Sequence, residues 1–385
     1  MIWSILSFII IFFLVVVSHE FGHFLVGRLN GIGVDEFTVG LGPVIFRKKG
    51  KHCLFTIRLF PIGGACIFKG MGASEREFEL DENGLPVDTK EEPEATDDND
   101  STDEADDTKE AGEYRAIPFN EAPVFARIAT VFAGPFFNVI LAFIFSLVLC
   151  WYCGSDAPVL AGVMEGYPAE SAGIQEGDII TRINSQRIYV WREISVVSLL
   201  NYGKTIEVEY ERDGERHVTS ITPKYDEETD RYYIGFQGGA SPVECNNISV
   251  FKYALIEVRY WLITTYRSLL FMFSGHASMD DVAGPVGMAN IIDETIEETS
   301  QYGLFIVILN LINIVVLLSV NMGVLNLLPF PALDGGRLLL LFVEVIIGRK
   351  ISEEKEGLFH MIGFMILMVF MVVVLFNDIM RVFGG

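Results

Sequence analysis

Four long apolar segments restrict this chain to a membrane. A helix rises about 1.5 Å per residue, so roughly 20 apolar residues cross the ~30 Å hydrocarbon core of a bilayer. The mean hydropathy of +0.39 and the 51% hydrophobic content of the 385 residues agree with such a location. We expect membrane spans at residues 2–26, 128–152, 304–328 and 357–376.

A cleaved signal peptide is the alternative interpretation of the first segment. Such peptides begin with basic residues and end at a cleavage site of small residues. The first segment has neither feature, and its apolar run leads directly into His19 and Glu20. We therefore interpret it as a permanent span.

Basic residues beside the spans predict how the chain crosses the membrane, because Lys and Arg gather in cytoplasmic loops. They follow the first and third spans, whereas residues 153–172 and 277–303 contain none. We expect both termini and the region 154–303 outside the cell. The end of the first span then lies near the cytoplasm.

The formal charge of −23 is concentrated in one segment. Residues 75–113 hold 18 acidic and three basic side chains, a local net charge of −15. Such a composition buries too little apolar surface to fold, so we expect a disordered cytoplasmic insert. We favour a solvated tether over a partner-binding tail. The chain has no basic stripe, which excludes nucleic acid as a partner.

Cys150 and Cys153 form a C-x-x-C pattern, the spacing of some redox pairs. They end a membrane segment beside Trp151 and Tyr152. We interpret them as thiols at the membrane interface without a catalytic role.

The end of the first span carries the sequence His19-Glu20-Phe21-Gly22-His23. Two imidazoles at positions i and i+4 share one face of a helix, so both reach a single metal ion. Glu20 between them suits a general base that takes a proton from metal-bound water. This pattern predicts a metal site that uses water within or just beneath the bilayer.

A catalytic zinc ion usually takes three protein ligands and a water, so a third ligand is required. Asp334 follows the third span at the same expected depth, where an unpaired carboxylate is costly. Asp is also a good N-cap, here for a helix over residues 335–348. Depth favours Asp334 as the ligand over His360 in the last span.

Two regions outside the spans have their own patterns. Alternating residues between 32 and 72 predict short hairpin strands. The order of elements over residues 158–223 resembles a bacterial protease-associated PDZ domain, which either binds a peptide or acts as a rigid spacer.

Residues 251–273 suit a helix at the outer membrane interface. We expect residues 284–287 to form a turn-rich loop before the third span.

Taken in order, these motifs resemble the site-2 protease family of intramembrane zinc metalloproteases, and within it the bacterial regulator-of-sigma protease group. The single PDZ-like region departs from members that carry two, and the acidic insert is not part of the usual pattern. The motifs that carry the resemblance are His19–His23, Gly63-Gly64, Gly134–Asn138, the PDZ-like region, Gly284-Pro285-Val286, Asn326–Gly336 and Phe376-Asn377-Asp378.

The resemblance implies roles for several of these residues. His19, His23 and Asp334 would bind Zn²⁺, with Glu20 as the catalytic base. A transmembrane substrate must unwind before its carbonyls become accessible. Asn321, Asn326 and Pro329 would hold the unwound segment, and residues 63–68, including Gly63 and Gly64, would pair with it as an added strand. Asn138 either contacts the substrate likewise or satisfies backbone groups in a kinked helix.

The partners implied are single-span membrane proteins, such as anti-sigma factors or remnant signal peptides, together with membrane lipid in a bacterial cell (inner) membrane. A catalytically inactive scaffold and an ion transporter are the other classes. The intact Glu20 argues against the first, and ionisable groups clustered at one depth argue against the second.

We therefore expect a polytopic α-helical membrane protein with four transmembrane helices, a cytoplasmic membrane-associated β-hairpin region and one extracytoplasmic PDZ-like α+β domain. The expected boundaries are 1–30 for the first span, 31–74 for the hairpin region, 75–113 for the insert, 114–153 for the second span, 154–240 for the PDZ-like domain, 241–303 for the following helix and loop, 304–336 for the third span and 337–385 for a short helix and the fourth span.

Overall fold

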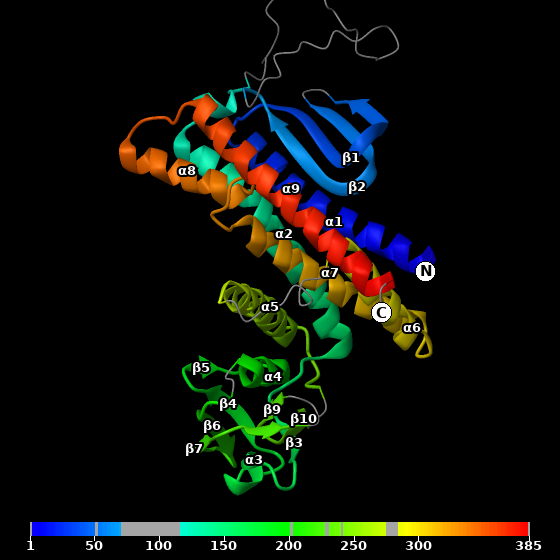
Figure 1. Cartoon of the computed structure of the whole chain (residues 1–385), viewed down its shortest axis with the longest axis vertical. Coiled ribbons are helices and arrows are strands. Elements are labelled where there is room, and N and C mark those ends of the chain that lie inside the picture. Colours follow the sequence, from blue (N-terminus) through cyan, green and yellow to red (C-terminus); the bar gives the residue numbers. More distant parts are fainter. Residues whose placement is uncertain are drawn as a thin grey trace, which may run out of the picture.

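The structure is a computed structural model that describes residues 2–50, 53–70, 116–200, 203–227, 231–239, 242–274 and 284–383. The insert expected at 75–113 lies outside these residues. A bundle of long helices forms the body of the molecule, with a β-hairpin against one side and a small α/β unit beyond helix α5 (Ser249–Phe273) (Figure 1). Both termini lie beside α6 (Pro285–Ser300), and α8 (Asp334–Ile347) lies at the opposite end of the bundle.

Four helices are long and apolar enough to cross a membrane: α1 (Ile2–Leu29), α2 (Val124–Cys153), α7 (Leu304–Asn326) and α9 (Glu353–Phe383). The prediction of four apolar helices is confirmed. In α1, α2 and α7, 33–39% of the most apolar window is buried inside the protein. In α9 the buried share is 11%. Helix α9 is therefore the span that packs least against the rest of the chain.

Close backbone contact brings α1 and α2 together at the His-Glu motif. A Cβ atom added to Gly22 of α1 would overlap the Ala133 carbonyl of α2. Small residues allow this approach between membrane helices. Pro135 lies inside α2 without interrupting it. The two helices therefore meet where the candidate ligands lie.

The hairpin consists of β1 (Val34–Lys49) and β2 (Leu54–Phe68), and both strands fold back on themselves. Residues 36–39 pair on one side with 54–57 and on the other with 64–67, which gives four short segments instead of a flat ribbon. Gly40, Gly42 and Gly63 have positive φ angles, which glycine adopts readily and which allow these bends. Among the described residues, no strand pairs with the second edge of segment 64–68.

The small unit follows α2 and contains a four-stranded antiparallel sheet of order β5-β4-β6-β7. Its core is formed by buried aliphatic side chains, among them Ile180, Ile183 and Ile206. Its elements are β3 (Leu160–Val163), α3 (Pro168–Ser171), β4 (Ile179–Ile183), β5 (Gln186–Arg187), α4 (Trp191–Leu200), β6 (Ile206–Arg212), β7 (Glu215–Ile221), β8 (Lys224–Asp226), β9 (Arg231–Tyr233) and β10 (Phe236–Gly239).

Helix α5 joins this unit to the bundle. It packs against α2 and α7 through Val258 and Ala254. Arg192 at the start of α4 contacts Asp156 at 3.0 Å and Glu257 of α5 at 2.5 Å. Two carboxylates around one guanidinium therefore tie the small unit to α5.

The prediction of a turn-rich loop at residues 284–287 is wrong. Pro285 is the first residue of α6, a position that suits proline because it lacks a backbone N–H. The carboxylate of Asp378 in α9 accepts hydrogen bonds from the backbone N–H groups of Gly284 and Gly287, at 3.2 and 2.9 Å. An acceptor 91 residues away therefore stabilises a helix start that the local composition did not reveal.

Candidate metal centre

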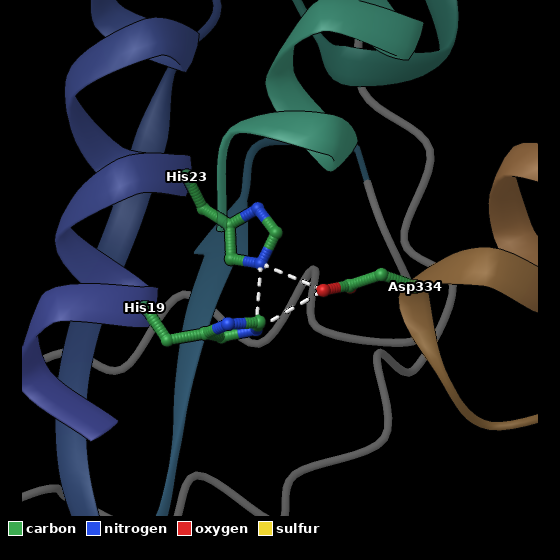
Figure 2. Close-up of side chains that lie close together, drawn as sticks. All are labelled: His19, His23 and Asp334. Atoms are coloured by element: carbon green, nitrogen blue, oxygen red, sulfur yellow. Dashed lines mark hydrogen bonds and ion pairs between the residues drawn. The ribbon is translucent and has the colours of Figure 1, made fainter. Parts of the chain in front are cut away.

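The two histidines of the motif lie on one face of α1, in its C-terminal half. Their side chains are buried, and their Nε2 atoms lie 3.2 Å apart (Figure 2). The Nδ1 atom of His23 lies 2.9 Å from the Thr130 carbonyl in α2, which accepts a hydrogen bond from it. That bond leaves the lone pair of His23 Nε2 free to bind a metal.

Asp334 reaches the same point from the first turn of α8 (Figure 2). Its Oδ2 atom lies 3.0 Å from His19 Nε2 and 3.3 Å from His23 Nε2. The N-cap of α8 is Leu333, and no side chain caps the helix, so the alternative capping role for Asp334 is wrong.

The three atoms fit a zinc ion by their spacing. Ligands at about 2.0–2.1 Å from a tetrahedral zinc lie roughly 3.3 Å from one another. The observed edges of 3.0, 3.2 and 3.3 Å form nearly that triangle. Oδ2 of Asp334 is buried and has no hydrogen-bonding geometry to any described residue. This is the arrangement of ligand atoms around a shared cation.

One face of α2 supports both imidazoles through residues spaced by four. Thr130 supplies the carbonyl for His23, and Gly134 leaves room for the ring, because an added Cβ atom would overlap His23 Nε2. Asn138 is fully buried, with its amide nitrogen 3.4 Å from His19 Nδ1. Its Oδ1 atom has no hydrogen-bond partner among the described residues. The amide oxygen and nitrogen of Asn138 can be exchanged by a flip of the side chain. Its Oδ1 atom then accepts a hydrogen bond from the N–H of His19 Nδ1.

Glu20 points toward the hairpin. Its side chain is buried, and a Cβ atom added to Gly64 would lie 2.8 Å from its Cγ atom. The backbone amide of Cys66 interacts with its carboxylate. Burial, followed by the nearby Glu20, raises the pKa of the Cys66 thiol, so this thiol stays protonated at neutral pH in the absence of a metal. Segment 64–68 therefore lies directly beside the candidate base.

The remaining predicted residues have contacts elsewhere. Asn321 accepts a hydrogen bond from the Thr265 hydroxyl of α5 at 2.5 Å. Asn326 donates to the Met322 carbonyl of its own helix at 3.0 Å. Pro329 lies exposed after the end of α7. The structure thus brings His19, Glu20, His23, Asp334, Asn138 and Gly64 together. Within the described residues, the hydrogen bonds of Asn321 and Asn326 go to other partners, Thr265 and Met322.

Sequence reasoning missed the part that α2 plays in the site. Thr130 acts through a backbone carbonyl, which leaves no mark in the residue type. The spacing of Thr130, Gly134 and Asn138 was a usable signal, because steps of four match the step from His19 to His23 on the facing helix.

Two buried imidazoles and a carboxylate converge on one point, with a second carboxylate beside them, next to helices long and apolar enough to cross a membrane. Such a set of side chains is typical of metal-dependent hydrolases. Comparison with known proteins gives the family. The model of peptidase family M50 matches residues 7–370, and the chain belongs to this family.

Named relatives agree over nearly their whole length. The chain is 33% identical to the zinc metalloprotease RasP of Shouchella clausii, over 99% of this chain and 100% of the relative. It is 32% identical to the regulator of sigma-W protease RasP of Bacillus subtilis, over 99% of both chains. These matches confirm the predicted class, a zinc metalloendopeptidase with Zn²⁺ as its cofactor.

Solved structures resemble only part of the chain. The PDZ domain of an SdrC-like protein from Listeria monocytogenes matches 23% of this chain and 88% of its own, with 19% identity and a TM-score of 0.20. A score this low does not establish a shared fold.

Proposed function

We propose that this chain hydrolyses peptide bonds within transmembrane segments, with zinc held by His19, His23 and Asp334 and with Glu20 as the general base. The observation that carries the proposal is the triangle of ligand atoms beside Glu20 within α1, a helix able to cross a membrane. Zinc, when bound there, polarises the scissile carbonyl and lowers the pKa of water to about 7.

The chain's own residues move the proton and orient the ligands. Glu20 accepts a proton from the attacking water and returns it to the leaving amine. The Thr130 carbonyl fixes the orientation of His23. Asn138, fully buried against His19, acts as its orienting partner and has no open face for a substrate.

The hairpin offers a site for an unwound substrate. Segment 64–68 has an edge without a strand partner among the described residues, and Gly64 lies against Glu20. An extended peptide that added to this edge would have its freed backbone groups satisfied beside the base. In this proposal, Asn321, Asn326 and Pro329 contact the substrate farther from the metal.

The substrates proposed are single-span proteins of a bacterial cell membrane, either anti-sigma factors or remnant signal peptides. The name of the Bacillus subtilis relative, a regulator of sigma-W protease, supports the first kind. The charge pattern of the loops supports a centre near the cytoplasm, with both termini and the small PDZ-like unit outside.

The substitution Glu20→Gln tests the proposal. We expect the variant to retain zinc and to lose cleavage of a model single-span substrate, because the amide occupies the same space but accepts no proton. Glu354→Gln, on an exposed position of α9, is the matched control and should cleave normally. Undiminished cleavage by Glu20→Gln would refute the assignment of the base.

The substrate class needs a separate test. Membrane fragments from cells with the wild-type chain and with Glu20→Gln are compared by mass spectrometry. We expect intact single-span segments to accumulate only with the variant. Accumulation of multi-span or soluble proteins instead would contradict the substrate class.

A further inference from the structure

Ala332, two residues before Asp334, has an unusual backbone conformation. Its φ angle is +75°, in the left-handed region that residues with a Cβ atom rarely adopt. Such a conformation persists only where surrounding contacts enforce it. The short segment that delivers Asp334 to the imidazoles is therefore held by something outside itself.

Helix α9 provides that contact. The backbone N–H of Ala332 donates a hydrogen bond to Nδ1 of His360 at 3.0 Å. Gly363 packs so tightly on Pro331 that an added Cβ atom would overlap the proline. Glu356 forms an ion pair with Arg337 of α8 at 3.2 Å. Residues 356, 360 and 363 follow a spacing of i, i+4 and i+7, so they share one face of α9. That face therefore contacts the chain both before and after Asp334.

Three of these residues, Ala332, Arg337 and His360, also line a cavity of about 400 Å³. Asp334 lines the same cavity, so the contacts of α9 lie directly beside the proposed zinc ligand. The rest of α9 is mostly uncovered by protein. His360 thus connects the most loosely packed span to the conformation of the ligand segment.

We propose that His360 is a positioning residue of the metal centre. It accepts the Ala332 N–H and thereby keeps Ala332 left-handed, so that Oδ2 of Asp334 meets His19 and His23. This inference rests on the proposed function, because it assumes that Asp334 binds the metal. It assigns His360 no contact with zinc and no part in proton transfer.

The state of the His360 ring gives the proposal a specific test. Because Nδ1 accepts a hydrogen bond, a neutral ring carries its hydrogen on Nε2, which is buried without a partner among the described residues. The Oδ1 atom of an asparagine reaches roughly the position of Nδ1, whereas the amide of glutamine reaches that of Nε2. Asparagine at position 360 should therefore accept the hydrogen bond from the Ala332 N–H, and glutamine should not.

The experiment measures how fast the full-length protein in detergent loses zinc to an excess of chelator, together with the visible spectrum of the Co²⁺-substituted protein. We expect His360→Leu and His360→Gln to lose zinc about tenfold faster, equivalent to ~1.4 kcal/mol, the magnitude of one left-handed residue. Their cobalt spectra should shift. His360→Asn should behave like wild type, as should Leu358→Ala, an exposed position on α9.

A second substitution keeps the test valid if His360→Leu folds poorly. Ala332→Gly removes the cost of the positive φ angle, so it should slow zinc loss from the His360→Leu protein toward the wild-type rate. Absence of that rescue, or a His360→Asn protein as defective as His360→Leu, would overturn the proposal.

Asp334→Asn separates this inference from the proposed function. If Asp334→Asn loses zinc while His360→Leu behaves like wild type, only the positioning role of His360 is refuted. If Asp334→Asn holds zinc as the wild type does, the proposed ligand set is wrong, and the positioning role of His360 is refuted with it.

Discussion

Gly134→Ala tests how closely α2 fits the metal ligands. An added Cβ atom would overlap Nε2 of His23 and would lie 2.5 Å from its Cε1 atom and 2.9 Å from its Cδ2 atom. Carbon atoms in contact prefer about 3.5–4.0 Å, so the ring must retreat by about 1 Å. That displacement takes Nε2 out of its bonding distance of about 2.0–2.1 Å from zinc.

Two effects of opposite sign act on the stability of this variant. Alanine in place of glycine inside a helix stabilises by roughly 0.5–1 kcal/mol. Overpacking a filled interior destabilises by about 1–3 kcal/mol. We expect the clash to outweigh the helical gain, with a lower melting temperature, zinc below one equivalent, and cleavage reduced at least about 100-fold, since a 1 Å misplacement has effects of that size.

The assay combines zinc content, cleavage of a single-span substrate and thermal unfolding in detergent. Gly357→Ala is the matched control, because Gly357 also lies within a helix and an added Cβ atom there meets nothing within 4 Å. This control should be as active as wild type. A Gly134→Ala protein with full zinc, full activity and the stability of the control would show that α2 does not need Gly134 to accommodate His23.

Three further substitutions test separate contacts. Asp334→Asn should release zinc while leaving α8 helical by circular dichroism, because Leu333 holds the cap position; unchanged zinc content would contradict this. Asn138→Ala should weaken metal affinity by about 10–100-fold in a chelator titration, because His19 loses its orienting partner; wild-type affinity would remove Asn138 from the site. Asp378→Ala should lower the free energy of unfolding by about 1 kcal/mol through loss of the N-terminal contacts of α6, with zinc retained; an unchanged unfolding curve would refute that contribution.

The parts of the fold that follow from local periodicity were predictable. Apolar runs of sufficient length gave the four helices, and the step of four from His19 to His23 gave the shared face. The expected depth of Asp334 in the membrane placed it near that face, and in the structure the three ligand atoms lie within 4.8 Å of one another. Each of these inferences needs only the geometry of a single helix or the thickness of a bilayer.

Contacts between distant segments were not predictable in the same way. Gly284 and Pro285 read locally as a turn, and only the carboxylate of Asp378 reveals the helix start. The left-handed Ala332 carries no mark in its residue type, since glycine is the usual occupant of that conformation. Its cause, His360, lies 28 residues away on another helix.

The zinc X-ray absorption spectrum of the full-length protein, purified without chelators, reports directly which atoms bind the metal. We expect one equivalent of zinc with nitrogen and oxygen neighbours only, at about 2.0–2.2 Å, including the scattering of two imidazole rings. A sulfur neighbour at about 2.3 Å, as a ligand such as Cys66 would give, or a protein that hydrolyses its substrate with no bound metal, would contradict it.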